Sequence, residues 1–257
     1  MEVNLFSHFQ KSKLFKMLVR LKDFIKNTTY KLIPPPRMNE SFSQAGEDCC
    51  YGFLFSELNI NKPSYLELGV CRPIKGSNTY RFYKQGGKGV LVEADSTQIK
   101  LIKEKRPNDL ILNIGVSTKS ATEADFYVFD VEGYNTFSKE EALNREKNSD
   151  SKIVRTDKVV LKPINAIIKE NFETYPDFLS IDIEGLDFEV LKTLDLERYP
   201  IPVICAETCA FSETHIKPKD KSIEKFMLTQ GYFLYADTYI NSIFVNDSWF
   251  YSVKRQE

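Results

Sequence analysis

Short β-rich segments alternating with helical segments constrain the fold of this chain more than any other feature of its sequence. Each segment is an almost continuous run of valine, isoleucine and leucine, as in a parallel sheet that is covered on both faces. Two further runs, 232–237 and 242–247, are only four residues apart, which is too short for a crossover helix and predicts an antiparallel pair. We therefore predict an α/β, doubly wound sheet that is mostly parallel with one antiparallel edge strand. The five β-rich segments are YLELGV (65–70), GVLVEA (89–94), DLILNIGV (109–116), FLSIDI (178–183) and VICAET (203–208).

Composition excludes several other classes of protein. The chain of 257 residues is 42% hydrophobic and 28% charged, and it has no apolar run of the length that a membrane span needs. Its net charge of -1 gives no basic footprint for nucleic acid. The five cysteines are odd in number and lack the spacing of a zinc site, and no secretory signal precedes them. We expect reduced thiols, a cytoplasmic location and no nucleic-acid partner.

The first forty residues differ from the rest of the chain. Residues 8–31 carry many basic side chains and a single acid, and their leucines and isoleucine recur at helical spacing. We predict a basic amphipathic helix that ends before the prolines at 34–36. The helix either packs on the domain or rests on anionic lipid at the inner face of the membrane, as a peripheral contact.

Residues 41–257 are expected to form a single domain. The segment at about 118–163 interrupts the alternation of strands and helices, because it contains extra β-rich runs and a charged, helix-like stretch. We interpret it as an insertion after the third strand. The oligomeric state is not encoded in any readable pattern.

The ends of the first two strands predict a nucleoside ligand without phosphates. Gly69 directly follows the first strand, where a glycine lets a ligand approach the backbone. The next glycine of that loop, Gly76, is seven positions away, so the G-x-G-x-x-G turn that holds a pyrophosphate is absent. Glu93 ends the second strand, 24 residues after Gly69, where a carboxylate is placed to accept hydrogen bonds from a ribose diol, with Asp95 as the alternative. S-adenosylmethionine fits these requirements, because it has a ribose, an adenine, no phosphate and a positive charge.

The fourth strand ends in a cluster of four acids: Asp182, Glu184, Asp187 and Glu189. Asp182 closes the strand, which lies next to the first strand in a doubly wound order and therefore faces the same crevice. Asp187 and Glu189 open the following helix, where acids favour the positive end of the helix dipole. We predict a functional role for Asp182 and a structural role for these last two acids.

Six sequence blocks in order resemble the FkbM-type methyltransferases. The resemblance spans roughly residues 41 to 247, and its blocks are SQAGED (43–48), YLELGVCRPIKGSNTYRFY (65–83), GVLVEAD (89–95), NIGVS (113–117), DFLSIDIEGLDFEVLKTLDL (177–196) and YADTYINSIFV (235–245). It implies a class I methyltransferase fold, Rossmann-like, with strand order 3-2-1-4-5-7-6. It also implies S-adenosylmethionine as donor and O-methylation of a hydroxyl on a sugar, surface polysaccharide or natural product.

The same resemblance implies roles for individual residues. Glu67 and Gly69 would flank the methionine part of the donor, with Ser77 and Asn78 lining the same pocket, and Glu93 would bind ribose. Asn113, Ile114 and Gly115 would border adenine. Asp182 and Glu184 would face the reacting methyl and the acceptor hydroxyl. In SQAGED, the side chains of Gln44, Glu47 and Asp48 would cap a helix or contact the donor.

Several alternatives stay open at this level. Asp182 is the first choice of general base, and His215, in the loop after the fifth strand, is the second. Asp182 and Glu207 could instead hold Mg²⁺, although their spacing resembles no dedicated cage, so our expectation is no metal. The alternative functions are a nicotinamide-dependent oxidoreductase and a non-catalytic protein that binds S-adenosylmethionine.

Overall fold

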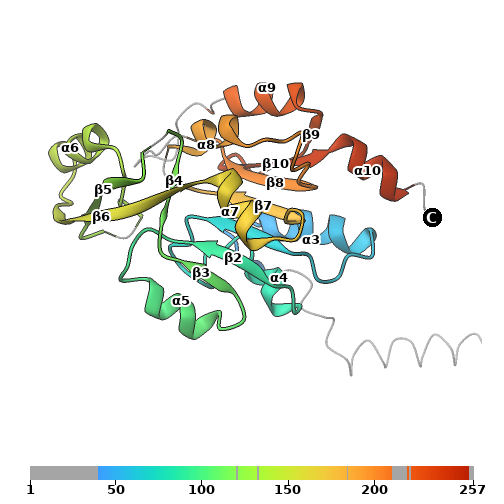
Figure 1. The fold of residues 1–257 in the computed structure, drawn as a ribbon, viewed down its shortest axis with the longest axis horizontal. Helices are drawn as coiled ribbons and strands as arrows, with labels where there is room; N and C mark the ends of the chain where they lie inside the picture. Colours follow the sequence, from blue (N-terminus) through green and yellow to red (C-terminus); the bar gives the residue numbers. More distant parts are fainter. Residues whose placement is uncertain are drawn as a thin grey trace, which may run out of the picture. The chain divides into compact units, whose positions relative to one another are not determined.

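The computed structural model describes residues 40–119, 121–131, 133–183, 185–209, 219 and 221–254 (Figure 1). The contacts divide the chain after Glu40, and the elements below belong to the compact unit Ser41–Glu257. The predicted basic helix at 8–31 lies outside the described residues, as do two predicted catalytic residues, Glu184 and His215.

A seven-stranded sheet forms the centre of this unit. Its parallel part comprises five strands, and β10 runs antiparallel to both of its neighbours, β8 and β9. Counted along this sheet alone, the strand order is the predicted 3-2-1-4-5-7-6, which confirms the predicted fold; the antiparallel strand lies one position inside the edge strand β9. In sheet order the strands are β3 (Leu110–Leu112), β2 (Gly89–Val92), β1 (Tyr65–Leu68), β7 (Phe178–Ile181), β8 (Val203–Glu207), β10 (Asn241–Asn246) and β9 (Tyr232–Asp237).

Helices cover both faces of this sheet, which explains why its strands are apolar at successive positions. In β1, Leu66 and Leu68 pack into one core cluster and Tyr65 packs into the other. The first cluster includes residues of α7 (Ile164–Asn171), α8 (Asp187–Thr193) and α9 (Ser222–Thr229). The second includes residues of α3 (Glu47–Glu57), α4 (Tyr80–Lys84), α5 (Ile99–Lys105) and α10 (Asp247–Lys254).

The predicted third strand at 109–116 is divided between two sheets. Its first part is β3, whereas its second part, β4 (Gly115–Ser117), pairs with β6 in a separate three-stranded sheet of order β4-β6-β5. Asn113 lies at the division, and its Nδ2 atom donates to the carbonyl oxygens of Glu93 and Ala94 at 2.8 and 3.1 Å. The chain therefore leaves the main sheet after Leu112, before the end of the predicted strand at 116, and the side-chain hydrogen bonds of Asn113 hold it at this point.

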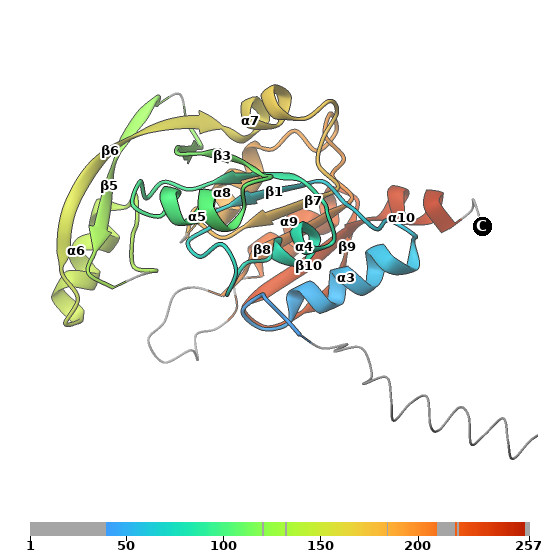
Figure 2. The same ribbon diagram turned by 90° about the horizontal axis from the view of Figure 1, so that it is seen from below.

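The second sheet, called the small sheet below, contains most of the predicted insertion. Its antiparallel strands β5 (Glu123–Phe129) and β6 (Ile153–Pro163) are connected through α6 (Lys139–Asn148). Phe126 and Val128 of β5 pack against Val159 of β6 in a small apolar cluster that also contacts Ala94, after β2. In Figures 1 and 2, β5, β6 and α6 lie together to the left of the main sheet.

Acids hold the start of α3 in place. Asp48 accepts a hydrogen bond from Ser41 Oγ at 2.6 Å, and Glu47 accepts from the backbone amide of Ala45 and from Asn241 Nδ2, each at 2.8 Å. Glu47 and Asp48 thus anchor the segment before α3 but do not cap the helix, because no side-chain cap hydrogen bond is formed at its N-cap, Gly46. They fix the segment just before α3 against the start of β10.

Candidate functional site

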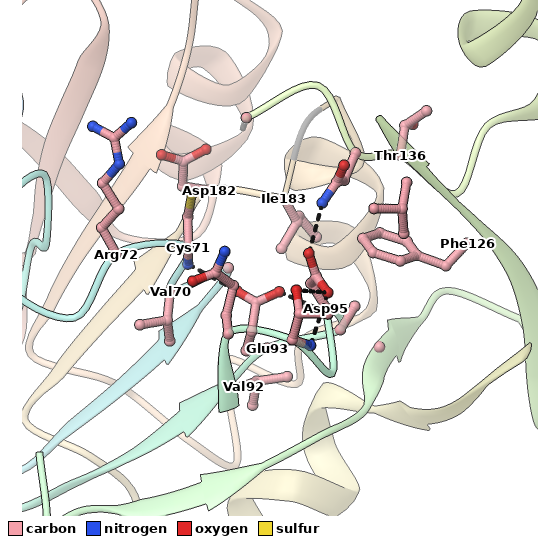
Figure 3. A pocket seen from close by; sticks show the side chains of 18 of the residues that line it. Val70, Cys71, Arg72, Val92, Glu93, Asp95, Phe126, Thr136, Asp182 and Ile183 are labelled. Atoms are coloured by element: carbon pink, nitrogen blue, oxygen red, sulfur yellow. Dashed lines mark hydrogen bonds between the residues drawn. The ribbon is translucent and has the colours of Figure 1, made fainter. Parts of the chain in front are cut away.

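A cavity of about 900 Å³ lies at the carboxyl ends of β1, β2 and β7 (Figure 3). Gly69, Glu93 and Asp182 line it from the main sheet. The small sheet and the loop that follows β5 contribute mainly apolar side chains: Phe126, Val128, Phe129, Phe137 and Val154. Carboxylates on one side and aromatic rings on the other suit a ligand that has both polar and flat apolar parts.

Gly69 lies between Glu93 and Asp182 in the sheet. The Gly69 amide donates to the Val92 carbonyl oxygen at 3.0 Å, and the Asp182 amide donates to the Leu68 carbonyl oxygen at 3.0 Å. These bonds continue the parallel register one residue past each strand, so Glu93 and Asp182 are both level with Gly69. Because side chains at one level of adjacent strands leave the sheet on the same face, the two carboxylates face the same cavity.

Glu93 is held by backbone amides at the end of β2. Its Oε2 accepts from the Cys71 amide at 2.8 Å and its Oε1 from the Asp95 amide at 2.7 Å, while the side chain is buried. Burial raises the pKa of the Glu93 carboxyl, and the two amides oppose that rise. Each oxygen keeps a further lone pair, so the carboxylate can accept two more hydrogen bonds from a diol.

Asp95 connects the loop after β2 to the small sheet. Its Oδ1 accepts from the amide and hydroxyl of Thr97 at 3.0 and 2.7 Å, and from Arg155 Nη2 at 2.7 Å. Its Oδ2 accepts from Asn135 Nδ2 at 3.1 Å. Burial alone would raise the pKa of the Asp95 carboxyl, but the hydrogen bonds from Thr97 and the Arg155 guanidinium outweigh it and lower that pKa. Asp95 is therefore an ionised anchor for the small sheet.

Three of the predicted donor-binding residues form a buried network instead of lining the cavity. Glu67 accepts from Thr79 Oγ1 at 2.6 Å, from Ser77 Oγ at 3.2 Å and from the Asn78 amide at 3.1 Å. The Arg106 guanidinium lies 3.9 Å from the Glu67 carboxylate. The alternation of β1 points Glu67 toward the second core cluster, so Glu67, Ser77 and Asn78 support the loop between β1 and α4 from the inside. Burial raises the pKa of Glu67, and Arg106 and the hydroxyls counteract it.

Of the three residues predicted to border adenine, two line the cavity and one does not. Ile114 and Gly115 line the cavity, whereas Asn113 is exposed and holds the loop after β2. A Cβ atom on Gly115 would lie 2.5 Å from Phe137 Cζ and 2.6 Å from Leu161 Cδ2. A glycine at this position therefore lets Phe137 and Leu161 of β6 pack closely against β4.

Asp182 and Glu207 differ in their relation to the cavity. Asp182 lines it, and Glu207 ends the adjacent strand β8 without lining it. Within the described ranges, no group of three or more histidine, cysteine, aspartate or glutamate residues is arranged to hold a metal ion. Asp187 is structural as predicted, since its carboxylate accepts from the amides of Ile183 and Gly185 at 3.2 and 3.1 Å.

Several cavity residues were not predicted from the sequence. Arg72 and Lys75 line the cavity from the loop that begins at Gly69. Because this loop follows the first strand, their position in the sequence could have identified them as cavity residues. Asn135 and Arg155 line it from the insertion, where no local pattern distinguishes them. The cavity is consequently less acidic than the strand ends alone suggest.

The fold is Rossmann-like and of the class I methyltransferase type. This follows from the order of the strands in the main sheet and from the two carboxylates, Glu93 and Asp182, that lie level with Gly69 at the strand ends. The chain belongs to the FkbM methyltransferase family, because the family model described as "Methyltransferase FkbM domain" matches residues 67–234, more than half of the chain. It is thus an S-adenosylmethionine-dependent methyltransferase, as the resemblance implied.

Solved structures and curated proteins were also compared with the chain. A candidate RNA methyltransferase from Pyrococcus horikoshii is 12% identical, with 82% of this chain and 89% of that chain covered and a TM-score of 0.39. A candidate O-methyltransferase from Klebsiella pneumoniae is 12% identical, with 86% and 96% covered and a TM-score of 0.38. An O-methyltransferase from Bacillus cereus in complex with SAH (S-adenosylhomocysteine) is 13% identical, with 87% and 88% covered and a TM-score of 0.35. A search of curated proteins found no match.

Proposed function

We propose that this methyltransferase acts on a hydroxyl oxygen of a sugar or glycan, such as a surface polysaccharide or a glycosylated natural product. The observation that carries the proposal is the placement of Glu93 and Asp182 on either side of Gly69 in one cavity. A cavity of about 900 Å³ is at the upper end of the usual range for small-molecule sites, so it has room for more than a nucleoside.

The residues present fit the donor in two respects. Glu93 has two free lone pairs for the ribose hydroxyls. Ile114 and Gly115 contribute a narrow apolar wall beside aromatic rings, which suits adenine.

Asp182 is the residue proposed to receive the acceptor proton. The bound donor supplies a methyl group on a positively charged sulfur, which is already an activated leaving group. The methyl would pass to the acceptor oxygen as its bond to sulfur breaks, and the Asp182 carboxylate would take the hydroxyl proton. Alignment of oxygen, methyl and sulfur contributes about 7–11 kcal/mol in favourable cases, more than the roughly 10²–10⁴-fold of a general base. Glu184 and His215 remain predicted participants that lie outside the described residues.

The experiment is a transfer assay with labelled S-adenosylmethionine and a panel of nucleotide sugars, lipid-linked sugars and oligosaccharides. We expect label in a sugar methyl ether and equimolar S-adenosylhomocysteine. Calorimetric binding of S-adenosylhomocysteine without any turnover on the panel would contradict the sugar acceptor. If calorimetry detects binding of NAD and no binding of S-adenosylhomocysteine, the oxidoreductase alternative is favoured.

Magnesium held by Asp182 and Glu207 is the remaining alternative for activating the acceptor. Carboxylates on adjacent strand ends support it, and the absence of Glu207 from the cavity wall speaks against it. Full activity in EDTA would remove the metal from the mechanism.

A further inference from the structure

Two side chains of the insertion converge on one carboxylate in the loop after β2. Arg155, in β6, donates from Nη2 to Asp95 Oδ1 at 2.7 Å, and Asn135, in the loop after β5, donates from Nδ2 to Asp95 Oδ2 at 3.1 Å. Asp95 is only 5% exposed, and all three residues line the cavity. The pairing spans 60 residues for Arg155 and 40 for Asn135, so it joins separate parts of the chain.

Asp95 also contacts Glu93, through a hydrogen bond from its backbone amide. The Asp95 amide donates to Glu93 Oε1 at 2.7 Å, and the other oxygen of Glu93 accepts from the Cys71 amide at 2.8 Å. A displacement of Asp95 would therefore move one of the two amides that orient Glu93. The contacts form one continuous path from the small sheet to Glu93.

We infer that Arg155 and Asn135 are positioning residues, which couple the placement of the small sheet to the orientation of Glu93 and thereby set the affinity for the donor. This inference rests on the proposed role of Glu93 in binding the donor ribose. Charge-assisted hydrogen bonds to a buried carboxylate are among the stronger ones in proteins, and Arg155 is the charged partner. The Arg155 side chain is 34% exposed, so solvent screening reduces its contribution.

The small sheet has apolar packing and strand pairing that do not involve Asp95. Phe126, Val128 and Val159 pack together with Phe137, and β5 and β6 are paired along seven registered positions. Loss of Arg155 should therefore leave the small sheet formed while its position relative to Glu93 becomes less well defined. This separates an effect on binding from an effect on stability.

The test measures S-adenosylhomocysteine binding to the full chain by titration calorimetry. We expect Arg155→Ala to raise Kd about tenfold and Asn135→Ala to raise it less, because Asn135 is uncharged. Arg155→Lys should recover part of the affinity. Lys158→Ala is the matched control: Lys158 is also in β6 and has a 2.7 Å ion pair with Asp125, but that pair stays within the small sheet. Its Kd should equal that of the wild type.

The binding stoichiometry separates positioning from folding. A positioning role raises Kd and the KM for the donor, whereas kcat and the number of sites stay unchanged. If Arg155→Ala instead reduces the number of sites or the melting temperature at an unchanged Kd, its role is structural and the inference is overturned. An unchanged Kd with no other effect overturns it equally. A wild-type chain that gives no heat with S-adenosylhomocysteine is a different failure, because it refutes the proposed donor site itself.

Discussion

A Cβ atom on Gly69 would lie 1.7 Å from the backbone oxygen of Asp182. Gly69 also has a φ of +82°, a conformation that other residues rarely adopt. We expect Gly69→Ala to abolish binding of S-adenosylhomocysteine and to destabilise the fold by about 3 kcal/mol or more, because the strand ends must move apart. Urea denaturation and calorimetry measure the two effects.

Gly231→Ala separates the clash from the backbone strain. Gly231 has a similar φ of +79°, and nothing lies within 4 Å of its added Cβ. This variant should lose only about 1 kcal/mol and should bind normally. Equal losses for the two variants would show that the contact with Asp182 is unimportant.

Asp182→Asn tests the proposed proton acceptor. The amide keeps the shape of the side chain but cannot take a proton, so kcat should fall by about 10²–10⁴-fold with little change in S-adenosylhomocysteine binding. Asp130→Asn is a control from the same cavity, since Asp130 bonds Ser151 Oγ and the Lys152 amide at 2.7 and 2.9 Å within the insertion. An unchanged kcat for Asp182→Asn would assign proton removal to another group.

Glu93→Gln should change how stability depends on pH. Burial raises the pKa of the Glu93 carboxyl above its ordinary value of 4.5. The stabilising contribution of this acid is therefore fully present below pH 4.5 and is lost as the pH rises through the folded-state pKa. Relative to the wild type, Glu93→Gln should gain free energy of unfolding as the pH rises above 4.5 in urea titrations without ligand. Parallel curves for the two proteins would contradict the raised pKa.

Cys71→Asn should stabilise the donor loop. Cys71 has a φ of +47°, in the left-handed region, and its amide donates to Glu93 at 2.8 Å. Asparagine tolerates this conformation better than cysteine, and the substitution leaves the amide in place. We expect a gain of about 0.5–1 kcal/mol for Cys71→Asn and a loss for the β-branched Cys71→Val, both by thermal denaturation. A stability order in which valine exceeds asparagine would refute the strain at this residue.

The basic segment at 8–31 is proposed as a peripheral membrane contact. No helix among the described residues is long and apolar enough to cross a bilayer. The full chain should sediment with anionic vesicles and not with neutral ones, and removal of residues 1–37 should abolish this, since each basic residue near an anionic surface contributes about 1 kcal/mol. Equal sedimentation of the truncated and full chains would exclude the lipid role.

Local sequence determined the strands of the main sheet and the two carboxylates that face the cavity, whereas the strand order came from the family resemblance. A run of valine, isoleucine and leucine between helices specifies a strand buried on both faces, and the residue after such a run lies at the edge where ligands bind. Glu93 and Asp182 both follow such runs, so their common cavity was predictable. The sequence also correctly marked Asp187 as a structural acid at the start of α8.

Only the tertiary structure decided which polar residues face the ligand and which face the core. Glu67 stands two residues before Gly69, but its partners Thr79 and Arg106 come from later elements, and their approach turns it into a buried structural acid. Asp95 meets Arg155 across 60 residues because β4 leaves the main sheet and carries the small sheet with it. The periodicity of a sequence segment indicates which face of a helix or strand is buried and where that element ends. Contacts between residues far apart in the sequence depend on the path of the whole chain, which no local pattern specifies.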